Sequence, residues 1–296
     1  MPLARADLSV RPARNDDLPG LRCLMETSKR AHLTLDWWML DDWVSNPAFL
    51  VAQSDQRAVG FGIGVRDASP VAWLRALVAE DGLSIGVLLD ALLPPMLDAL
   101  RAQGGPTLAC LAWPEWLAEQ LPHYGFESMA RVVTLCKDDE SAPGRNLVTG
   151  ALVRKAQPGD LEAIVTLDHA AFDVEWWYGP TTFHRMLNTP AHFIVAEQNG
   201  ALAGYAYGDA PGLQAHISRL AVHPAHQRRG LGAELLGDLI AHFLAQDVTR
   251  ITVNTQTDNE ASLRLYRRWG FAPRGEPVTV WQISLGDPHG RPHATI

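Results

Sequence analysis

The sequence predicts a mixed α/β (α+β) fold in which one folding unit is used twice. Short apolar runs with the alternation of strands are separated by longer stretches with helical periodicity. Similar segments recur in the same order at an offset of about 143 residues, which indicates an internal duplication. The 296 residues also suffice for about two domains, each able to bury its own core.

Four pairs of segments carry the duplication. They share order and spacing, although each match alone is short: Arg11–Leu18 with Arg154–Leu161, Asp36–Trp38 with Glu175–Trp177, Val51–Gln53 with Val195–Glu197, and Tyr124–Phe126 with Trp269–Phe271. A polar stretch between the halves is typical of a linker. We therefore expect domains at 1–140 and 150–285, a linker at 141–149 and a flexible tail at 286–296.

Each half is expected to run in the same order: a short strand, a helix, an aromatic loop, a β-hairpin, a strand, a long helix, a strand, a short helix and a final strand. The second hairpin turns at Asn199 and Gly200, a strong two-residue turn signal. The first strand and the two hairpin strands are expected at Leu8–Pro12, Phe49–Gln53 and Val59–Val65, and again at Ala151–Lys155, Phe193–Glu197 and Leu202–Tyr207.

Composition excludes several classes of protein. The net charge of −8 argues against a general nucleic-acid binder, and three scattered cysteines are too few for a disulfide framework or a tetrahedral zinc site. The N-terminus lacks the apolar segment of a signal peptide, and acidic residues and prolines interrupt the most apolar helical stretch. We expect a soluble, cytoplasmic protein that binds no membrane, no nucleic acid and no metal.

The most informative segment joins a strand to a long helix. The strand ends at Val222, and the helix after Gly232 carries an apolar stripe at helical spacing. Gly230 and Gly232 let the backbone approach a ligand closely and leave N–H groups pointing outward, and Arg228 and Arg229 precede them. With the helix dipole, these groups form an anion site suited to a diphosphate.

Two familiar phosphate-binding loops fit this segment poorly. The P-loop pattern is absent, and a dinucleotide fingerprint would need a third glycine where Leu235 stands. An ordinary tight turn between strand and helix is the structural alternative.

A second motif follows about 27 residues later, where Asn259, Ala261, Leu265-Tyr266 and Gly270-Phe271 occur in order. Together with the glycine loop, this order resembles the GNAT superfamily of acyl-CoA-dependent N-acetyltransferases over residues 151–285. The resemblance implies two GNAT-like domains in tandem. Each would be a mixed, mostly antiparallel central sheet flanked by helices, with a splayed strand pair at the acetyl-CoA site.

The resemblance also implies a role for each residue of the two motifs. The end of the strand, Leu220–Val222, would present backbone groups to the pantetheine arm and thioester carbonyl of acetyl-CoA, the co-substrate. Asn259 would contact the pantetheine, and Tyr266 would be the general acid for the departing thiolate. The residues that would hold the coenzyme are Leu220, Ala221, Val222, Arg228, Arg229, Gly230, Leu231, Gly232, Ala233 and Asn259.

Elementary chemistry is consistent with these roles. An amine that attacks a thioester needs a donor for the oxyanion, which the N–H of Val222 at a splayed strand can supply. A phenol with an ordinary pKa of about 10 stays protonated at neutral pH and can protonate the leaving thiolate. The structural alternatives are a core tyrosine at Tyr266 and a helix cap at Asn259.

The general base is less well defined. By strand alternation His216 shares a face with Ser218 and Leu220, so His216 is the candidate that would line the substrate cleft. A packed histidine is the structural alternative. The rival bases are Asp173, Glu175 and Tyr207.

The first half lacks the residues of this site. The aligned pairs are Leu121 with Tyr266, Pro114 with Asn259 and, when Gly86 is placed on Gly230, Leu88 with Gly232. Leu88 would crowd a diphosphate, and Pro114 removes a backbone donor. We expect the first half to keep the fold without catalysing transfer and to pack against the second as an internal pseudo-dimer.

Aromatic loops follow the first helix of both halves, at Asp36–Leu40 and Glu175–Tyr178. In GNAT-like folds this region faces the acceptor, and tryptophans beside acidic residues can hold a cationic amine. The alternative is that these tryptophans staple helix to sheet.

These observations favour an N-acetyltransferase that transfers an acetyl group from acetyl-CoA to a primary amine by direct transfer in a ternary complex. The second half would carry the catalytic residues, Tyr266 and His216. The acceptor would be a small-molecule or peptide amine, and the chain a monomer, with a homodimer as the alternative. Mycothiol synthase, also tandem with one active half, makes a small-thiol biosynthetic role a specific option. A non-catalytic acyl-CoA-binding sensor or scaffold is the alternative function.

Overall fold

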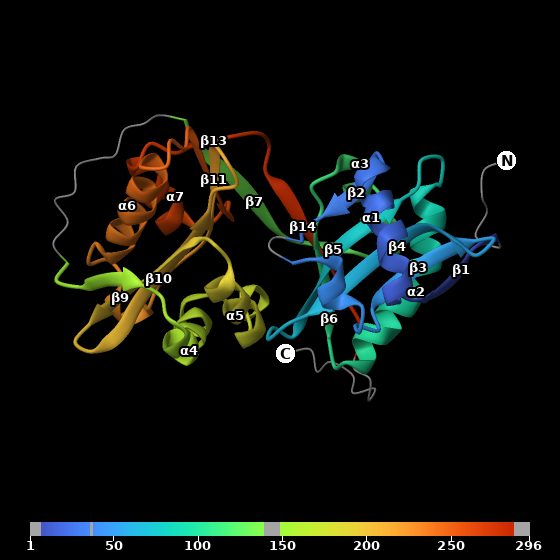
Figure 1. The fold of residues 1–296 in the computed structure, drawn as a ribbon, viewed down its shortest axis with the longest axis horizontal. Helices are drawn as coiled ribbons and strands as arrows, with labels where there is room; N and C mark the ends of the chain where they lie inside the picture. The colour runs from blue at the N-terminus through green and yellow to red at the C-terminus, as the bar shows by residue number, and fades with distance from the viewer. Residues whose placement is uncertain (1–6, 36–37, 139–148, 287–296) are drawn as a thin grey trace, which may run out of the picture. The chain divides into compact units, whose positions relative to one another are not determined.

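The mixed α/β class is confirmed in a computed structural model of the chain (Figure 1). The structure describes residues 7–35, 38–138 and 149–286. The expected linker at 141–149 and tail at 286–296 lie outside the described residues, apart from Thr149 and Gly286. Within the described ranges no helix combines the length and the apolar character that a membrane span requires.

The chain forms two units, each with its own run of paired strands. The first comprises Met1–Met129 and Thr279–Ile296, and the second comprises Ala130–Val278. The described elements of the first unit are β1 (Ser9–Pro12), α1 (Leu18–Thr27), β2 (Arg30–Leu33), β3 (Phe49–Ser54), β4 (Arg57–Arg66), β5 (Val71–Ala79), α2 (Ile85–Ala102), β6 (Thr107–Leu111), α3 (Glu115–Ala118) and β14 (Val278–Ser284), with 3₁₀ turns at Asn15–Asp17, Leu40–Trp43 and Leu121–Tyr124.

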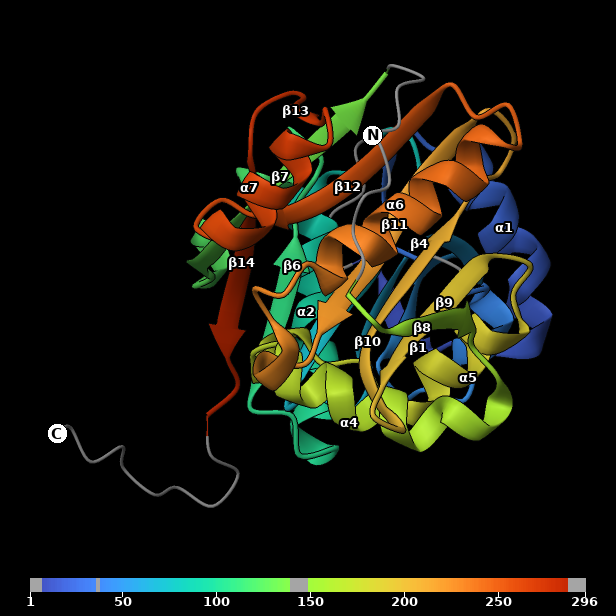
Figure 2. The ribbon, with the colours of Figure 1, turned by 90° about the vertical axis from the view of Figure 1, so that its left-hand side faces the viewer.

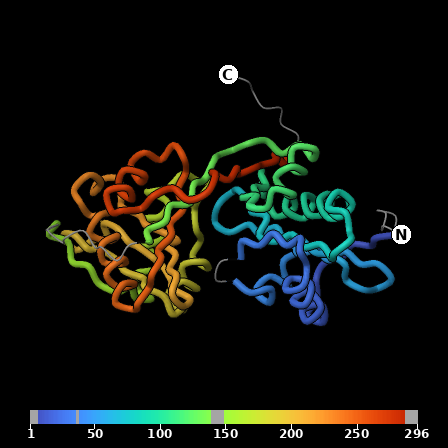
Figure 3. Tube along the Cα trace, turned by 90° about the horizontal axis from the view of Figure 1, so that it is seen from above, coloured from blue at the N-terminus to red at the C-terminus, as the bar shows by residue number. Residues whose placement is uncertain are grey.

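The sheet of the first unit carries a helix on each face. Its strands pair in the order β1-β3-β4-β5-β6-β14, and β2 pairs with β5. Alternation along β3 points Phe49 and Val51 toward α1, and Leu50 and Ala52 toward α2. Figure 3 shows the two helices on opposite sides of this sheet.

The second unit repeats this plan. Its described elements are β7 (Glu127–Lys137), which begins in the first unit, β8 (Leu152–Lys155), α4 (Leu161–Ala171), α5 (Pro180–Asn188), β9 (His192–Gln198), β10 (Ala201–Asp209), β11 (Gln214–Val222), α6 (Leu231–Leu244), β12 (Arg250–Gln256), α7 (Glu260–Arg268) and β13 (Ala272–Pro273), with 3₁₀ turns at Pro158–Asp160, Val174–Trp176 and Pro224–His226. The strand order is β7-β12-β11-β10-β9-β8, and among these described pairs only β11 and β12 are parallel. In Figure 2, α6 lies across β10 and β11.

The local sequence signals placed the hairpins correctly. The turn between β9 and β10 has positive φ at both Asn199 and Gly200, 55° and 79°, as the two-residue turn requires. The predicted first strands and hairpin strands differ from the observed ones by at most two residues at either end. These segments are determined by local turn chemistry and alternation, which the sequence displays directly.

The last strand of each half lies in the sheet of the other unit, an exchange that the sequence does not reveal. β7 comes from the first half, yet it pairs with β12 from Val132↔Gln256 to Lys137↔Ile251. β14 comes from the second half and pairs with β6. The chain crosses between the units in these two strands (Figure 3). Each half of the sequence therefore completes the other unit.

The exchange predicts that Leu135→Ala in β7 destabilises the second unit. Leu135 is fully buried in the core that includes α6, so the truncation should cost about 2–5 kcal/mol. Hydrogen exchange should show lost protection in β11 and β12 while β4 and β5 are unaffected. Leu108→Ala in β6 is the matched control and should produce the reverse pattern. Loss of protection confined to β4 and β5 in Leu135→Ala would contradict the exchange.

Candidate functional site

The strands β11 and β12 are paired over only part of their length. Their parallel register runs from Gln214↔Arg250 to Ile217↔Val253 and ends there, whereas β11 continues to Val222. Beyond Ile217, β11 is paired with β10. The expected splayed strand pair is therefore present (Figure 2).

The open edge of β11 carries the backbone groups of Leu220 and Val222. The N–H of His223 donates to the carbonyl of Ala203 at 2.9 Å, which fixes the phase of the β10–β11 ladder. Because hydrogen-bonded residues alternate in an antiparallel ladder, the N–H groups of Leu220 and Val222 face away from β10 and into the gap. Gln227 Nε2 donates to the Val222 carbonyl at 3.1 Å, from the loop that follows.

This loop leads into α6 with an unusual backbone. Arg228 and Gly230 both have left-handed conformations, with φ of 60° and 91°. Gly230 is the N-cap residue, and the N–H of Glu234 donates to its carbonyl at 3.0 Å. The N–H groups of Leu231 and Gly232 therefore precede the first turn's intrahelical bonds and point out of the helix end, where the dipole favours an anion.

The side chains of the loop leave this helix end accessible. Arg228 and Arg229 are exposed, and neither forms an ion pair with a residue in the described ranges. A Cβ added at Gly232 would meet Val222 Cγ2 at 3.5 Å and Leu265 Cδ2 at 3.6 Å, which are ordinary contacts. The protein's own packing therefore does not require glycine there. Of the other predicted loop residues, Leu231 is buried and Ala233 half-buried.

Tyr266 lies on the buried side of α7, as its spacing predicts. Its ring packs against Phe271 with centroids 5.8 Å apart, and the residue is 5% exposed. The hydroxyl has no hydrogen-bond partner among the described residues. Burial raises the pKa of Tyr266 above its ordinary value.

Asn259 is the N-cap residue of α7. Its Oδ1 accepts a hydrogen bond from the N–H of Ser262 at 3.1 Å, so the helix cap expected as the structural alternative is present. A contact with the pantetheine arm would therefore fall to its Nδ2 group.

The predicted strand face of His216 is wrong, because β11 carries a bulge. A register shift in the β10–β11 pairing makes Ser218 an extra residue and reverses the alternation. Ile217 and Leu220 consequently pack toward the same core, and His216 faces away from Leu220.

The position of His216 along the strand also separates it from the gap. Its Nδ1 lies 2.9 Å from Thr252 Oγ1, on the part of β11 that is still paired with β12. Six residues of extended strand, about 20 Å, separate His216 from Val222. The structure therefore places His216 on the paired part of β11, far from Val222 at the end of the strand.

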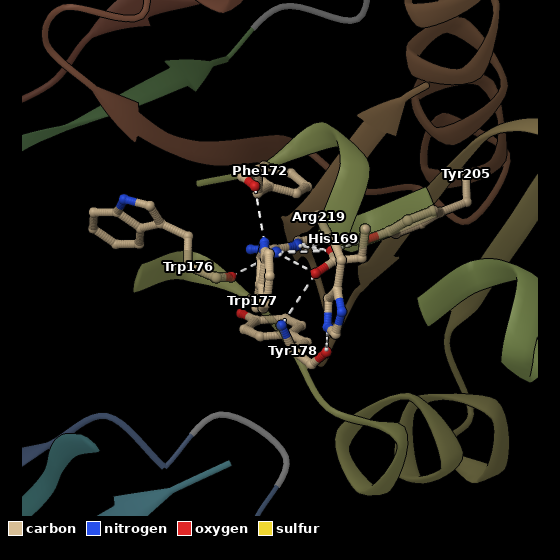
Figure 4. Close-up of polar contacts among 8 residues, drawn as sticks. His169, Phe172, Trp176, Trp177, Tyr178, Tyr205 and Arg219 are labelled. Carbon is tan, nitrogen blue, oxygen red and sulfur yellow. Dashed lines mark hydrogen bonds and ion pairs between the residues drawn. The ribbon is translucent and has the colours of Figure 1, made fainter. Parts of the chain in front are cut away.

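A buried polar cluster between β11 and α4 was missed by sequence reasoning (Figure 4). Asp168 is fully buried and Arg219 is 8% exposed. Arg219 Nε donates to Asp168 Oδ1 at 2.9 Å and Nη2 to Oδ2 at 3.0 Å, and the Tyr205 hydroxyl donates to Oδ1. The signal for it was an aspartate on the apolar stripe of α4, one residue after Leu167.

Arg219 anchors the segment Phe172–Tyr178, hereafter the anchored segment. The guanidinium carbon lies 3.6 Å from the ring centroid of Phe172 and 4.0 Å from that of Tyr178. Arg219 Nη2 also donates to the Trp176 carbonyl at 2.7 Å, and the Tyr178 N–H donates to Asp168 at 3.1 Å. The segment beside the open strand is thus fixed at several points (Figure 4).

The aromatic loops contain staples of the kind expected as the structural alternative. Trp177 Nε1 donates to the Phe172 carbonyl at 2.9 Å, and its ring stacks on His169 at 4.2 Å. In the first unit, Trp38 stacks on Trp43 at 5.7 Å. The other predicted loop residues there, Asp36 and Trp37, lie outside the described residues.

The first unit has the same splay, but a strand fills it. β5 and β6 are parallel only from Val71↔Thr107 to Trp73↔Ala109. Beyond that point β2 pairs antiparallel with Ala76–Ala79 of β5. The strand edge that is open in the second unit is occupied in the first.

The strand pairings show which residues of the two halves correspond more firmly than the sequence alone does. On this register Leu88 falls opposite Leu231. A Cβ added at Gly60 would meet Leu88 Cδ1 at 2.8 Å, and one added at Gly204 would meet Leu235 Cδ1 at 2.9 Å and Leu231 Cδ2 at 3.4 Å. The offset of the strand pairs differs by one residue from the predicted alignment of Leu88 with Gly232. The register comes from the first parallel pair of each unit, Val71↔Thr107 and Gln214↔Arg250. Gln214 follows Val71 by the same number of residues as Arg250 follows Thr107.

The glycine loop has no counterpart in the first unit. α2 begins at Ile85, which corresponds to Arg228, so a helical turn occupies the positions of the left-handed loop. The first unit therefore has a helical turn where the second has the left-handed loop.

Comparison with known proteins agrees with this geometry. Residues 160–271 match the acetyltransferase (GNAT) family. The chain is 33% identical over 143 residues to the N-alpha-acetyltransferase RimI of Mycobacterium tuberculosis, a match that covers 47% of this chain and 86% of that protein. The chain therefore belongs to the GNAT family of N-acetyltransferases, a family of acyltransferase enzymes that use acetyl-CoA.

Two solved structures share the tandem fold. A GCN5-related N-acetyltransferase from Sphaerobacter thermophilus has a TM-score of 0.66 and 16% identity, over 96% of this chain and 97% of that chain. A tandem GNAT protein from the clavulanic acid biosynthesis pathway has a TM-score of 0.66 and 21% identity, over 94% of this chain and 99% of that chain. At these identities the likeness shows the fold alone, and it supports the tandem arrangement.

The two glycines of the loop should respond in opposite ways to alanine. Gly230→Ala should lower the free energy of unfolding by about 1–2 kcal/mol, because a side chain disfavours its left-handed φ. Gly232→Ala should raise it by about 0.5–1 kcal/mol, because the site is helical and has room. Urea denaturation of the two variants beside the wild type measures both changes. A destabilised Gly232→Ala would mean that the helix end is more crowded than described.

Proposed function

We propose that the second unit transfers an acetyl group from acetyl-CoA to a primary amine by direct transfer within a ternary complex. The observation that carries the proposal is the open edge of β11 next to the free N–H groups at the start of α6. Leu220 and Val222 would hold the pantetheine arm along this edge, and the Val222 N–H would stabilise the oxyanion. The diphosphate would lie at the helix end beside Arg228 and Arg229.

The proposed chemistry needs an acid and a base at the gap. The amine nitrogen forms a bond to the thioester carbonyl carbon, the C–S bond breaks, and Tyr266 protonates the leaving thiolate. Its raised pKa keeps this acid protonated through the mildly alkaline range. Asp173 and Glu175 are better placed than His216 to take the amine proton, because they lie on the anchored segment, which is bonded to β11.

The first unit, in this proposal, binds no acetyl-CoA. β2 occupies the strand edge where the thioester would lie, and the first turn of α2 replaces the diphosphate loop. The first half of the sequence contributes β7, the strand that flanks β12, to the active unit.

For the acceptor we propose the α-amine of a peptide or protein. The name of the relative at 33% identity, an N-alpha-acetyltransferase, favours this class, and Asp173 and Glu175 would attract its ammonium group. A small-molecule amine is the second candidate, since a tandem neighbour belongs to the clavulanic acid pathway and mycothiol synthase is also tandem. A screen of both amine classes with detection of released free thiol separates them.

Tyr266→Phe should leave acetyl-CoA binding intact and lower the transfer rate by a factor of about 10²–10⁴. The hydroxyl bonds to no described residue, so the fold should survive its loss. Because the pKa of Tyr266 is raised, the acid form persists at every pH below that value, and the wild-type rate should show no alkaline decline from this group between about pH 7 and about pH 9.

Tyr124→Phe in the first unit is the matched control and should leave the transfer rate unchanged. Calorimetry measures acetyl-CoA affinity, and thiol release measures transfer. Turnover in Tyr266→Phe equal to that of the wild type would exclude this residue as the acid. A wild-type chain that binds acetyl-CoA but transfers acetyl to no amine would favour the sensor or scaffold instead.

A further inference from the structure

The segment that follows the first helix has opposite conformations in the two units. In the first unit it forms β2 and pairs with Ala76–Ala79, closing the edge of β5. In the second it is the anchored segment, with a 3₁₀ turn at Val174–Trp176, and the edge of β11 stays open. The segment that follows the first helix therefore closes the gap beside β5 in the first unit and leaves the gap beside β11 open in the second.

The residues that anchor the segment in the second unit have apolar counterparts in the first. On the register set by the strands, the pairs are Asp168 with Met25, Arg219 with Ala76, and Tyr205 with Phe61. The bulges support this register, since the shift in β11 leaves out Ser218 and the shift in β5 leaves out Arg75. In the second unit Arg219 donates a hydrogen bond to the Trp176 carbonyl. The apolar residues at the corresponding positions of the first unit have no side-chain donor for such a bond.

We propose that the Asp168–Arg219 pair keeps the acetyl-CoA gap open by holding the anchored segment in a turn, away from the edge of β11. An unpaired strand edge is a template for any extended segment nearby. Without the pair, the anchored segment pairs with Leu220 and Val222, as β2 pairs with Leu77 and Ala79. Asp168 and Arg219 are positioning residues, and the inference rests on the proposed function only for the identity of the ligand.

The geometry makes Arg219 suited to this task. It follows the bulge at Ser218 and precedes Leu220, so it belongs to the open part of the strand. Its guanidinium donates hydrogen bonds to Asp168 and to the Trp176 carbonyl, and the rings of Phe172 and Tyr178 pack against it. Arg219 of β11 therefore holds the anchored segment, which is the segment that would otherwise pair with the open edge of β11.

The test is the double variant Asp168→Met with Arg219→Met in the full chain, which leaves no unpaired buried charge. Hydrogen exchange at the N–H groups of Leu220 and Val222, measured without ligand, should slow by at least about tenfold as they become paired. The dissociation constant for acetyl-CoA should rise by at least about tenfold. The control, Arg154→Met with Asp160→Met, removes another ion pair of this unit and should change neither quantity.

Arg219→Lys keeps the positive charge beside Asp168 but cannot donate to both Asp168 and the Trp176 carbonyl as arginine does. This variant replaces the double variant if the double variant fails to fold. It should shift both quantities in the same direction by a smaller factor. Wild-type exchange and affinity in a folded variant would overturn the proposal. So would faster exchange in the anchored segment with no change at Leu220 and Val222. If the wild type itself binds no acetyl-CoA, the proposed function fails, and the exchange measurement still decides whether the pair holds the gap open.

Discussion

The buried pair of Asp168 and Arg219 links the strand that carries the site to the helix that precedes the anchored segment. Removing two charges from water is costly, and the cost is offset here by paired hydrogen bonds, a bond to Tyr205 and aromatic cover. Such a pair adds little net stability, but it strongly disfavours any arrangement that separates its members. The position of the anchored segment, and with it the shape of the open strand edge, follows from that constraint.

The duplicated fold has diverged by conformation more than by architecture. Both units keep the hairpin, the parallel strand pair and the long helix, and both keep a strand glycine, Gly60 or Gly204, under a leucine of that helix. They differ where a strand or a turn follows the first helix, and where a helical turn or a left-handed loop precedes the long helix. The exchange of β7 and β14 gives the first half a structural role in the second unit that does not depend on catalysis.

Much of the fold and part of the site could be predicted from local signals. Turn residues such as Asn199 and Gly200 and the apolar stripe of α6 act within a few residues, so the hairpins and the long helix were predicted near their observed bounds. The loop at Arg228–Gly232 and the buried side of α7 are local in the same sense. Their proposed chemistry comes from resemblance rather than from periodicity.

The features that sequence reasoning missed all depend on contacts between distant segments. The bulge at Ser218 exists only in the pairing with β10, so regular alternation assigned His216 to the wrong face. β2 is four residues long and contains an arginine and a histidine, which gives no strand signal until β5 is beside it. Asp168 is recognisable as unusual on an apolar stripe, but its partner, 51 positions away, is not.

A crystal structure of the full chain with acetyl-CoA tests the central claim most directly, because it locates the coenzyme in one unit, in both or in neither. We expect one coenzyme per chain, in the second unit, with the thioester carbonyl against the N–H of Val222, the diphosphate at the start of α6, and the anchored segment still bonded to Arg219. A coenzyme beside β5 in the first unit, or one bound away from the open edge of β11, would contradict it.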